Sequence, residues 1–239
     1  RASPPNISWT IDLDLLRNEL ALPKTVLLND FVAQAWAICS PLGAQCEPVI
    51  TPPASRVRAD DVRVVIGAGT GLGKAIVVPV NGASKYRVLP SEGGHSRLPI
   101  QSDEEFDFLT WLREEAGVEC VTYDEIVSGR GLARIHEFLT GEQLTPAEIS
   151  AKEALTSDTL SWFARFYGRV CRDFALETLP FGGLYIAGGI AAKIPGLVQH
   201  QEFRREFFDC PSHRQVLERV PVLLNRNEES GIWGAGFRG

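Results

Sequence analysis

Residues 64–80 read VVIGAGTGLGKAIVVPV, which places four glycines between two apolar runs. The run AIVVPV is rich in β-branched residues and is typical of a strand, as is the VVI before the glycines. This pattern predicts a β-hairpin whose tight turn contains Gly69, Thr70 and Gly71. Glycines in such a turn leave successive backbone N–H groups free to converge on an anion, and Thr70 adds a hydroxyl donor.

Two well-known phosphate-binding loops do not match this stretch. A Walker loop would need a glycine where the chain has Ala68, and a serine or threonine where it has Ala75. A dinucleotide fingerprint would need its last glycine at Leu72 or Lys74. Both loops also require a following helix, whereas a strand follows this one. Taken alone, the stretch leaves two interpretations open: an anion-binding hairpin and a plain glycine-rich turn.

The segments around the hairpin alternate between strand and helix patterns. The stretch TVLLNDF predicts a short buried strand that ends at Asn29 and Asp30, and residues 31–39 predict an apolar helix. Residues 40–61 are rich in proline and turn formers and predict an irregular connection. The mixture predicts an α/β fold of layered sheets and helices. Further strands are expected at residues 62–66, 74–80 and 86–89 and within GGLYIAGGI and VPVLLN, and helices at residues 103–116, 131–139, 146–155 and 159–179 and in QEFRREFFD.

The composition limits the classes of function. The chain has 239 residues, of which 44% are hydrophobic, enough for one large domain or two modest ones. A formal net charge of −6 disfavours nucleic acid or an anionic membrane surface as a partner. The sequence has no apolar run long enough for a membrane span and no apolar signal core, so we expect a cytoplasmic protein.

Polar residues stand beside two of the predicted strands. Asn29 and Asp30 end a strand, where side chains can project into a cleft, although Asp30 on its own fits better as the cap of the next helix. Glu92 and His95 flank a Gly-Gly turn in SEGGHSRLP and form an acceptor and donor pair that could bind adjacent hydroxyls. A surface turn with an incidental histidine is the competing interpretation of that motif.

Two later stretches add further candidates. The stretch TYDEIVSGRGL places Asp124 and Glu125 just before a Ser-Gly helix junction. The stretch LYIAGGIAAKIP ends a strand on Gly188 and Gly189, where a flat group could lie against exposed backbone. Each of these motifs is weak alone, so their order along the chain matters more than any single one.

In this order, the motifs LLNDF, GAGTGLG, EGGH, SGRGL and IAGGI resemble those of the bacterial-type glucokinase family. Its members are hexose kinases with the two-domain fold of the actin-like ATPases, which is ribonuclease H-like. The resemblance runs from NISWTIDL near the start to SGIWGAG near the end. It implies ATP-dependent phosphorylation of glucose at the 6-hydroxyl, with Mg²⁺ accompanying ATP.

The resemblance also implies roles for individual residues. Asp30 matches the general base that accepts the proton of the sugar's 6-hydroxyl as it attacks the γ-phosphate of ATP, and Asn29 matches a sugar ligand. Glu92 and His95 match the pair that holds hydroxyls at the other end of the ring. These residue types suit phosphoryl transfer, which asks the protein mainly for alignment and charge stabilisation.

One position departs from the family pattern. A further sugar-binding glutamate of the family falls on Asp124 when VSG is aligned without a gap, and this side chain is one methylene shorter. Glu125 could substitute if the helix start is shifted. The implied nucleotide contacts are the phosphate loop at Gly67, Gly69, Thr70 and Gly71, and the adenosine contact at Gly188 and Gly189.

One family motif has no counterpart in the sequence. Family members begin with a first phosphate loop, DxGGTN, whose Asp helps to hold Mg²⁺, and Arg1 aligns beyond it, inside the small domain. Either the sequence is a fragment of a complete enzyme, or the protein lacks half of its nucleotide clamp and has little or no kinase activity. We expect residues 1–39 and 227–239 to be the remnant of the small α/β domain, and residues 40–226 to form the large α/β domain.

Two other hypotheses stay open at this point. A non-catalytic sugar-binding or regulatory protein derived from this fold would fit the missing loop and Asp124 in place of glutamate. An unrelated nucleotide-binding α/β protein would place Glu92 and His95 far from Asp30. The resemblance further implies a homodimer. Because the chain lacks the cysteine-rich zinc motif of the related repressor and sugar-kinase family, we expect no structural metal.

Overall fold

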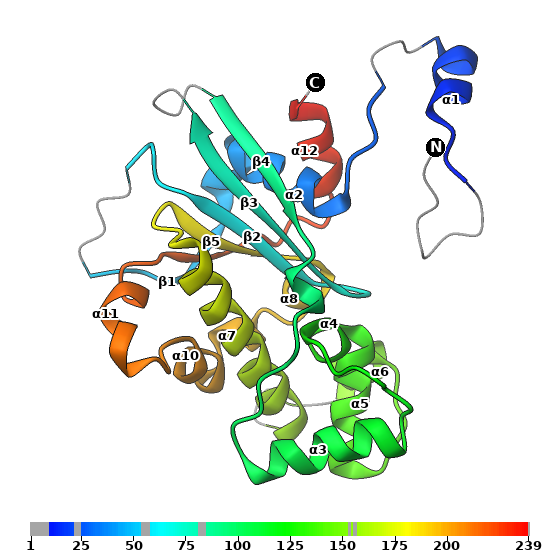
Figure 1. Ribbon diagram of the computed structural model, residues 1–239, viewed down its shortest axis with the longest axis vertical. Helices are drawn as coiled ribbons and strands as arrows, with labels where there is room; N and C mark the ends of the chain where they lie inside the picture. Colours follow the sequence, from blue (N-terminus) through cyan, green and yellow to red (C-terminus); the bar gives the residue numbers. More distant parts are fainter. Residues whose placement is uncertain are drawn as a thin grey trace.

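The predicted hairpin lies in the middle of a six-stranded sheet (Figure 1). The computed structural model describes residues 10–21, 25–53, 58–80, 85–152, 154 and 157–238. Across the sheet the strands are ordered β1-β6-β5-β2-β3-β4. All the strands predicted from residue 62 onward are confirmed. The strands are β1 Glu47–Ile50, β2 Arg63–Ala68, β3 Leu72–Val80, β4 Lys85–Ser91, β5 Gly183–Ala187 and β6 Val222–Leu224.

Helices lie on both faces of the sheet, and the longer ones follow the sequence prediction. None of the helices in the described ranges is both long and apolar enough to cross a membrane. The α-helices are α1 Leu13–Leu20, α2 Asp30–Cys39, α3 Asp103–Glu114, α4 Tyr123–Ile126, α5 Gly129–Thr140, α6 Pro146–Lys152, α7 Asp158–Thr178, α8 Gly189–Lys193, α9 Gly196–Gln199, α10 Gln201–Phe207, α11 Arg214–Leu217 and α12 Ser230–Arg238. The 3₁₀ helices are η1 Pro41–Gln45, η2 Gly93–His95 and η3 Pro211–His213.

Strand direction determines which edge of the sheet can hold a ligand. β2 runs parallel to β5, and β5 parallel to β6, whereas β1, β3 and β4 are antiparallel to their neighbours. The buried ends of the parallel strands, Ala68, Ala187 and Leu224, therefore lie along one edge. Ligands of open α/β sheets bind in the crevice outside the carboxyl ends of such strands. The glycine-rich segments that follow β2 and β5 meet at this edge.

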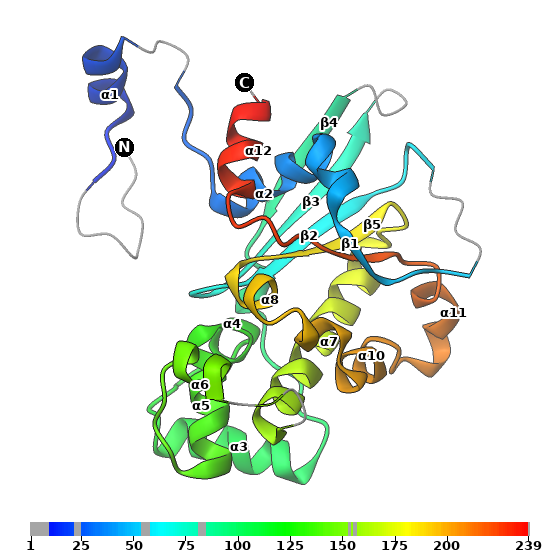
Figure 2. The ribbon, with the colours of Figure 1, turned by 180° about the vertical axis from the view of Figure 1, so that it is seen from behind.

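α7 covers one face of the sheet and carries a lobe made of α3 to α6 at its far end (Figures 1 and 2). The helix begins at Ser157, whose side chain accepts a hydrogen bond from the Leu160 N–H, and it ends at Leu179 in the left-handed conformation. Its buried side chains form one apolar core with Val64 and Ile66 of β2. This core joins the sheet to the lobe, so the lobe is held next to the end of the hairpin.

α2 and α12 pack together on the opposite face of the sheet. They can approach closely because residue 234 is glycine, since a Cβ at this position would overlap the backbone of Ala33. α2 then buries Ala35 and Ile38 against Val65 and its neighbours on β3 and β5. These two helices belong to the segments expected to form the small domain, and the domain division itself stays a prediction.

The prediction of a short buried strand in TVLLNDF, ending at Asn29 and Asp30, is wrong. Residues 25–29 have no regular secondary structure, and Val26 and Leu27 are exposed. A strand requires a neighbour to satisfy its backbone hydrogen bonds, and no strand of the described residues pairs with this segment. Figure 1 shows the segment running clear of the sheet before it enters α2. The apolar pattern alone could not reveal that no described strand pairs with residues 25–29.

Several short helices, the strand β1 and the helix α12 were not expected from the sequence. β1 lies inside the stretch predicted as an irregular connection, where pairing of Glu47 with Leu224 of β6 makes it a strand. α12 forms in the glycine-rich end of the chain. Glycine disfavours helix by about 1 kcal/mol relative to alanine, so packing on α2 has to compensate. Both β1 and α12 come from contacts between distant parts of the chain.

Candidate functional site

The turn of the β2–β3 hairpin is built from backbone hydrogen bonds. The Gly69 N–H donates to the Gly71 carbonyl (2.8 Å), and the Gly129 N–H at the start of α5 donates to the Gly69 carbonyl (2.8 Å). A Cβ at Gly69 would meet open space, and Thr70 is exposed. The predicted hairpin turn is therefore confirmed, and α5 supports it from the side of the lobe. The expectation that its N–H groups are free is wrong for Gly69, whose N–H is bonded within the turn.

Phe31 fastens the start of α2 to this hairpin. Gly67 and Gly73 face each other across β2 and β3. The Phe31 ring covers both, because a Cβ on Gly73 would overlap the ring and one on Gly67 would lie 3.0 Å from it. A Cβ on Gly67 would also overlap the Ala187 carbonyl. Packing against Phe31 and Ala187 therefore explains why positions 67 and 73 are glycine. The predicted nucleotide contact of Gly67 stays a prediction.

Asn29 and Asp30 have different roles at the start of α2. Asn29 Oδ1 accepts hydrogen bonds from the N–H groups of Phe31 (2.9 Å) and Val32 (3.2 Å), so Asn29 is the helix cap. Asp30 Oδ1 also accepts from the Phe31 N–H (2.9 Å). Both side chains are exposed. The interpretation of Asp30 as a mere cap loses its basis, because its neighbour already fills that position.

The motif EGGH, at residues 92–95, forms a loop seated on β3. Glu92 Oε2 lies 4.0 Å from His95 Nε2, and both side chains are exposed. Gly94 rests on the Leu72 carbonyl, since a Cβ there would overlap it. The Gly93 N–H donates to Ser91 Oγ (3.1 Å). The predicted acceptor and donor pair therefore stands beside the hairpin turn, and we call residues 92–95 the EGGH loop.

Asp124 reaches the same hairpin from α4. Its Oδ1 accepts a hydrogen bond from the Leu72 N–H (2.6 Å), and its Oδ2 pairs with Arg130 (3.2 Å). The approach is close enough that a Cβ on Gly71 would overlap the carboxylate. Glu125, the alternative sugar ligand, pairs instead with Arg130 and Arg134. Of the two carboxylates, Asp124 is the one bound to the turn.

Gly188 and Gly189 follow β5 at the ligand-binding edge. Gly188 has a φ of +88°, and a Cβ there would lie 2.6 Å from the Ala68 carbonyl, so only glycine fits. A small cavity of about 140 Å³ opens beside the two glycines and is also lined by Gln34 and Asn225. Asn225 is 4% exposed, and its Nδ2 has no hydrogen-bond partner among the described residues.

The hairpin is thus the common neighbour of the predicted motifs. Phe31, the EGGH loop, Asp124 and Gly188 each contact residues 67–74. The sequence revealed the motifs but not the side chains that join them, which include Phe31, Gln34 and Arg130. One signal was available: glycine at alternate positions of a strand marks a close approach by another group.

The metal expected with ATP requires no preformed protein site. Among the residues that the structure describes, no three His, Cys, Asp or Glu side chains form a metal cluster. Mg²⁺ that accompanies a nucleotide is held largely by phosphate oxygens and water, with one or two carboxylates. At the hairpin the exposed hydroxyl of Thr70 is compatible with this kind of binding, whereas both carboxylate oxygens of Asp124 are engaged by Leu72 and Arg130.

Known proteins resemble this chain in sequence and in fold. A family model described as Glucokinase matches residues 1–238. A glucokinase of Trichormus variabilis is 30% identical over 263 residues, which cover 97% of this chain and 75% of the relative. The crystal structure of a glucokinase from an Antarctic psychrotroph gives a TM-score of 0.78 at 26% identity, covering 95% of this chain and 72% of that one. A ROK family glucokinase from Streptomyces griseus, in complex with glucose and AMPPNP, gives 0.61 at 22% identity, covering 97% and 73%.

Proposed function

The chain belongs to the glucokinase family, and on that premise we propose that this sugar kinase transfers the γ-phosphate of ATP to the 6-hydroxyl of glucose. One observation carries the proposal: two motifs from distant parts of the chain are seated on one glycine hairpin. Phe31 holds the start of α2 over Gly67 and Gly73, and the EGGH loop rests on Leu72. The family relationship excludes the hypothesis of an unrelated nucleotide-binding protein.

In the proposed reaction Asp30 is the general base. Its carboxylate accepts the proton of the 6-hydroxyl as the oxygen attacks the γ-phosphate, while Asn29, Glu92, His95 and Asp124 bind the sugar. Asn29 caps α2 and so fixes the backbone from which Asp30 projects. General base catalysis depends first on position. This supports the proposal, because Asp30 lies between the cap residue Asn29 and Phe31, whose ring packs on the hairpin.

The nucleotide would lie along the edge formed by β2 and β5. We assign the phosphates of ATP to the backbone at Gly69, Thr70 and Gly71, and the adenosine to Gly188 and Gly189. Because the Gly69 N–H is already bonded to the Gly71 carbonyl, the phosphate oxygens would bind the N–H groups of Thr70 and Gly71 and lie near the N-terminus of α5. Mg²⁺ would neutralise charge on the phosphates. The complex of the Streptomyces relative with glucose and AMPPNP supports this pair of ligands.

The test is a coupled assay for glucose 6-phosphate with protein expressed from its complete reading frame, supplied with glucose, ATP and Mg²⁺. Asp30→Asn removes the base without changing side-chain size and is expected to lower kcat by about 10²–10⁴. Glucose binding, measured by calorimetry, should weaken much less. The matched control is Asp107→Asn, an exposed carboxylate on α3, with unchanged kcat. An active wild type whose Asp30→Asn variant is equally active would contradict the assignment of the base.

A second candidate is a non-catalytic sugar-binding or regulatory protein on the same fold. Asp124 favours it, because both of its carboxylate oxygens are already engaged by Leu72 and Arg130. Calorimetry separates the two candidates. Glucose binding without any ATP binding supports the regulatory protein, whereas ATP binding together with turnover supports the kinase.

The quaternary and domain arrangements follow from the family relationship and are proposals as well. We propose a homodimer in the cytoplasm, in which residues 1–39 and 227–239 belong to the small domain and residues 40–226 to the large one. Size-exclusion chromatography with light scattering tests the dimer. Limited proteolysis between α2 and β1 tests the domain boundary, since linkers between domains are preferred cleavage sites.

A further inference from the structure

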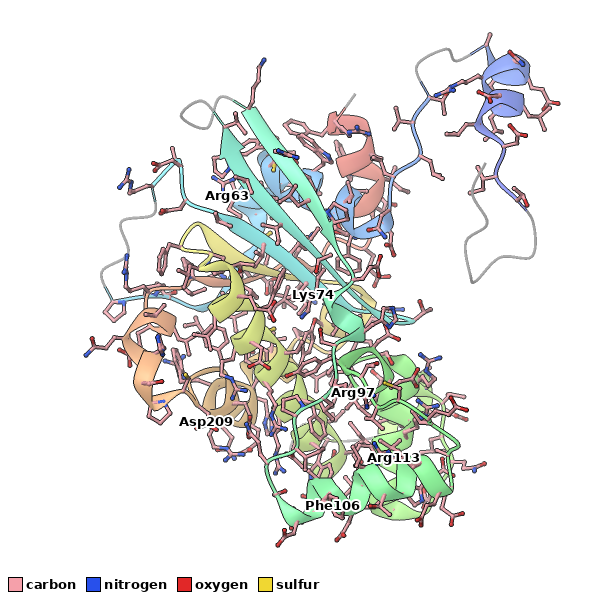
Figure 3. The ribbon with its side chains drawn as sticks, in the orientation of Figure 1. Arg63, Lys74, Arg97, Phe106, Arg113 and Asp209 are labelled. Atoms are coloured by element: carbon pink, nitrogen blue, oxygen red, sulfur yellow. The ribbon has the colours of Figure 1, made fainter. Side chains whose placement is uncertain are left out.

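Lys74 is a buried lysine directly beneath the proposed site. It follows Gly73 on β3 and is only 2% exposed. Its Nζ lies 4.9 Å from the ring centre of Phe174 on α7 and 5.7 Å from that of Tyr123 on α4. Figure 3 labels Lys74 at the lower part of the sheet, where it meets the helical lobe. The side chain therefore fills the junction between the hairpin, α4 and α7.

The EGGH loop lies on top of this side chain. A Cβ on Gly93 would lie 3.4 Å from both Cδ and Nζ of Lys74. The neighbouring Gly94 rests on the backbone of Leu72, two residues earlier on the same strand. The backbone of β3 supports one glycine of the loop, and the Lys74 side chain supports the other. The height of Glu92 and His95 above the sheet depends on both supports.

Lys74 is unusual among the buried charges of this protein. In the described part of the chain no hydrogen bond or ion pair reaches its ammonium group, which is held by the two aromatic rings. Burial lowers its pKa, and attraction to Glu177, Cys171 and Asp173 only partly opposes this. A buried charge without a direct partner destabilises a fold.

We propose that Lys74 is a positioning residue for sugar binding, because it fixes the EGGH loop on β3 from below. The inference rests on the proposed function, in which Glu92 and His95 bind glucose. The long side chain sets the distance between the loop and the strand, and its cation–π contacts keep it from swinging away. Lys74 contacts Gly93 of the sugar loop, whereas the phosphate loop at residues 69–71 is linked to this arrangement only through the backbone of Leu72, so the larger effect is expected on glucose binding.

The test compares Lys74→Ala with Lys74→Met and with Lys85→Ala, a control at the exposed first residue of β4. Removing the support is expected to raise the KM for glucose by about tenfold, with kcat and the KM for ATP changed by less than about threefold. Lys74→Met keeps the length of the side chain and its contact with the aromatic rings, and should recover most of the glucose affinity. Calorimetric titration with glucose gives the same ranking independently of turnover.

A second variant keeps the inference testable if Lys74→Ala does not fold. Gly93→Val pushes the loop away from an intact Lys74 and should raise the glucose KM in the same way. In the Lys74→Ala background the space is open, so the two effects should not add. An active wild type with unchanged glucose KM in both Lys74→Ala and Gly93→Val overturns the inference and leaves the proposed function intact. A wild type that binds glucose but never phosphorylates it overturns the kinase assignment instead, and the calorimetric ranking still decides the role of Lys74.

Discussion

Two regions of the protein bury a positive charge, and they do so in opposite ways. In the helical region, Arg169 of α7 is fully buried and forms hydrogen bonds with both carboxylate oxygens of Glu105 (2.8 Å each) and with Glu206 (3.0 Å). Although burial by itself raises the pKa of Glu105, the hydrogen bonds and charge of Arg169 bring it below its ordinary value. In the hairpin region, the rings of Tyr123 and Phe174 face the Lys74 ammonium group, and no described residue forms a hydrogen bond or ion pair with it.

This difference distinguishes Arg169, a buried charge that stabilises the fold, from Lys74, a buried charge that we propose serves the sugar-binding loop. Arg169 ties α3, α7 and α10 together, and each of its three guanidinium nitrogens donates to an acceptor, as is typical of a buried charge that stabilises a fold. Among the described residues no acceptor forms a hydrogen bond with the Lys74 ammonium group, which lies under the proposed sugar loop. Buried charges that are incompletely satisfied cost stability, and such costs are typical of functional sites.

The largest expected effect is on stability in the helical region. Arg169→Met removes the closest cationic partner of the buried Glu105 and Glu206, which keep only the longer pairs with Arg165, Arg172 and Arg205, and should lower the free energy of unfolding by about 3–5 kcal/mol. Urea unfolding followed by circular dichroism measures the loss. The matched control is Arg214→Met, which breaks an exposed pair with Glu218 and should cost less than about 1 kcal/mol. Equal losses in the two variants would remove the contrast between buried and exposed pairs.

A smaller effect is expected where the hairpin meets α2. Gly73→Ala forces the Phe31 ring to move, because the new Cβ would overlap it. Overpacking of this kind costs about 1–3 kcal/mol, and it should also lower kcat, since Asp30 precedes the displaced ring. Phe31→Ala makes room for the new methyl group, so the double variant should be more stable than the sum of the single losses predicts. Additive losses would show that the ring does not hold α2 to the hairpin.

The smallest effect is the pH dependence contributed by Lys74. Its pKa is lowered in the folded state from an ordinary value of 10.5, so above the folded-state pKa the unfolded chain binds more protons at this site. Stability must then rise with pH over the interval between the folded-state pKa and 10.5. Relative to Lys74→Met, the wild type should gain stability as the pH is raised through this interval. Parallel stability curves for the two proteins would show that the folded state does not disfavour the charged lysine.

Local sequence predicted most of the elements and all of the motifs discussed above. The β2–β3 hairpin followed from its glycines and β-branched flanks, and α2, α3, α5 and α7 followed from apolar periodicity. The prediction was wrong for residues 25–29 and missed β1 and α12, because each depends on the presence or absence of a distant partner. For the candidate site, the sequence pointed to Asp30, Glu92 and Asp124. It could not show that their segments meet at one hairpin, because these contacts join residues that are far apart in the chain.

The sequence by itself determined the membership of the glucokinase family, the order of its motifs and the glycine-rich turn of the hairpin. These properties are local, since turn geometry and residue chemistry depend on a few neighbouring positions. Only the tertiary structure decided that Phe31 covers Gly67 and Gly73, that Asp124 binds the backbone of Leu72, and that a buried Lys74 supports the EGGH loop. The physical reason is that close packing and buried charge depend on what surrounds a residue in space, and sequence spacing does not encode those surroundings.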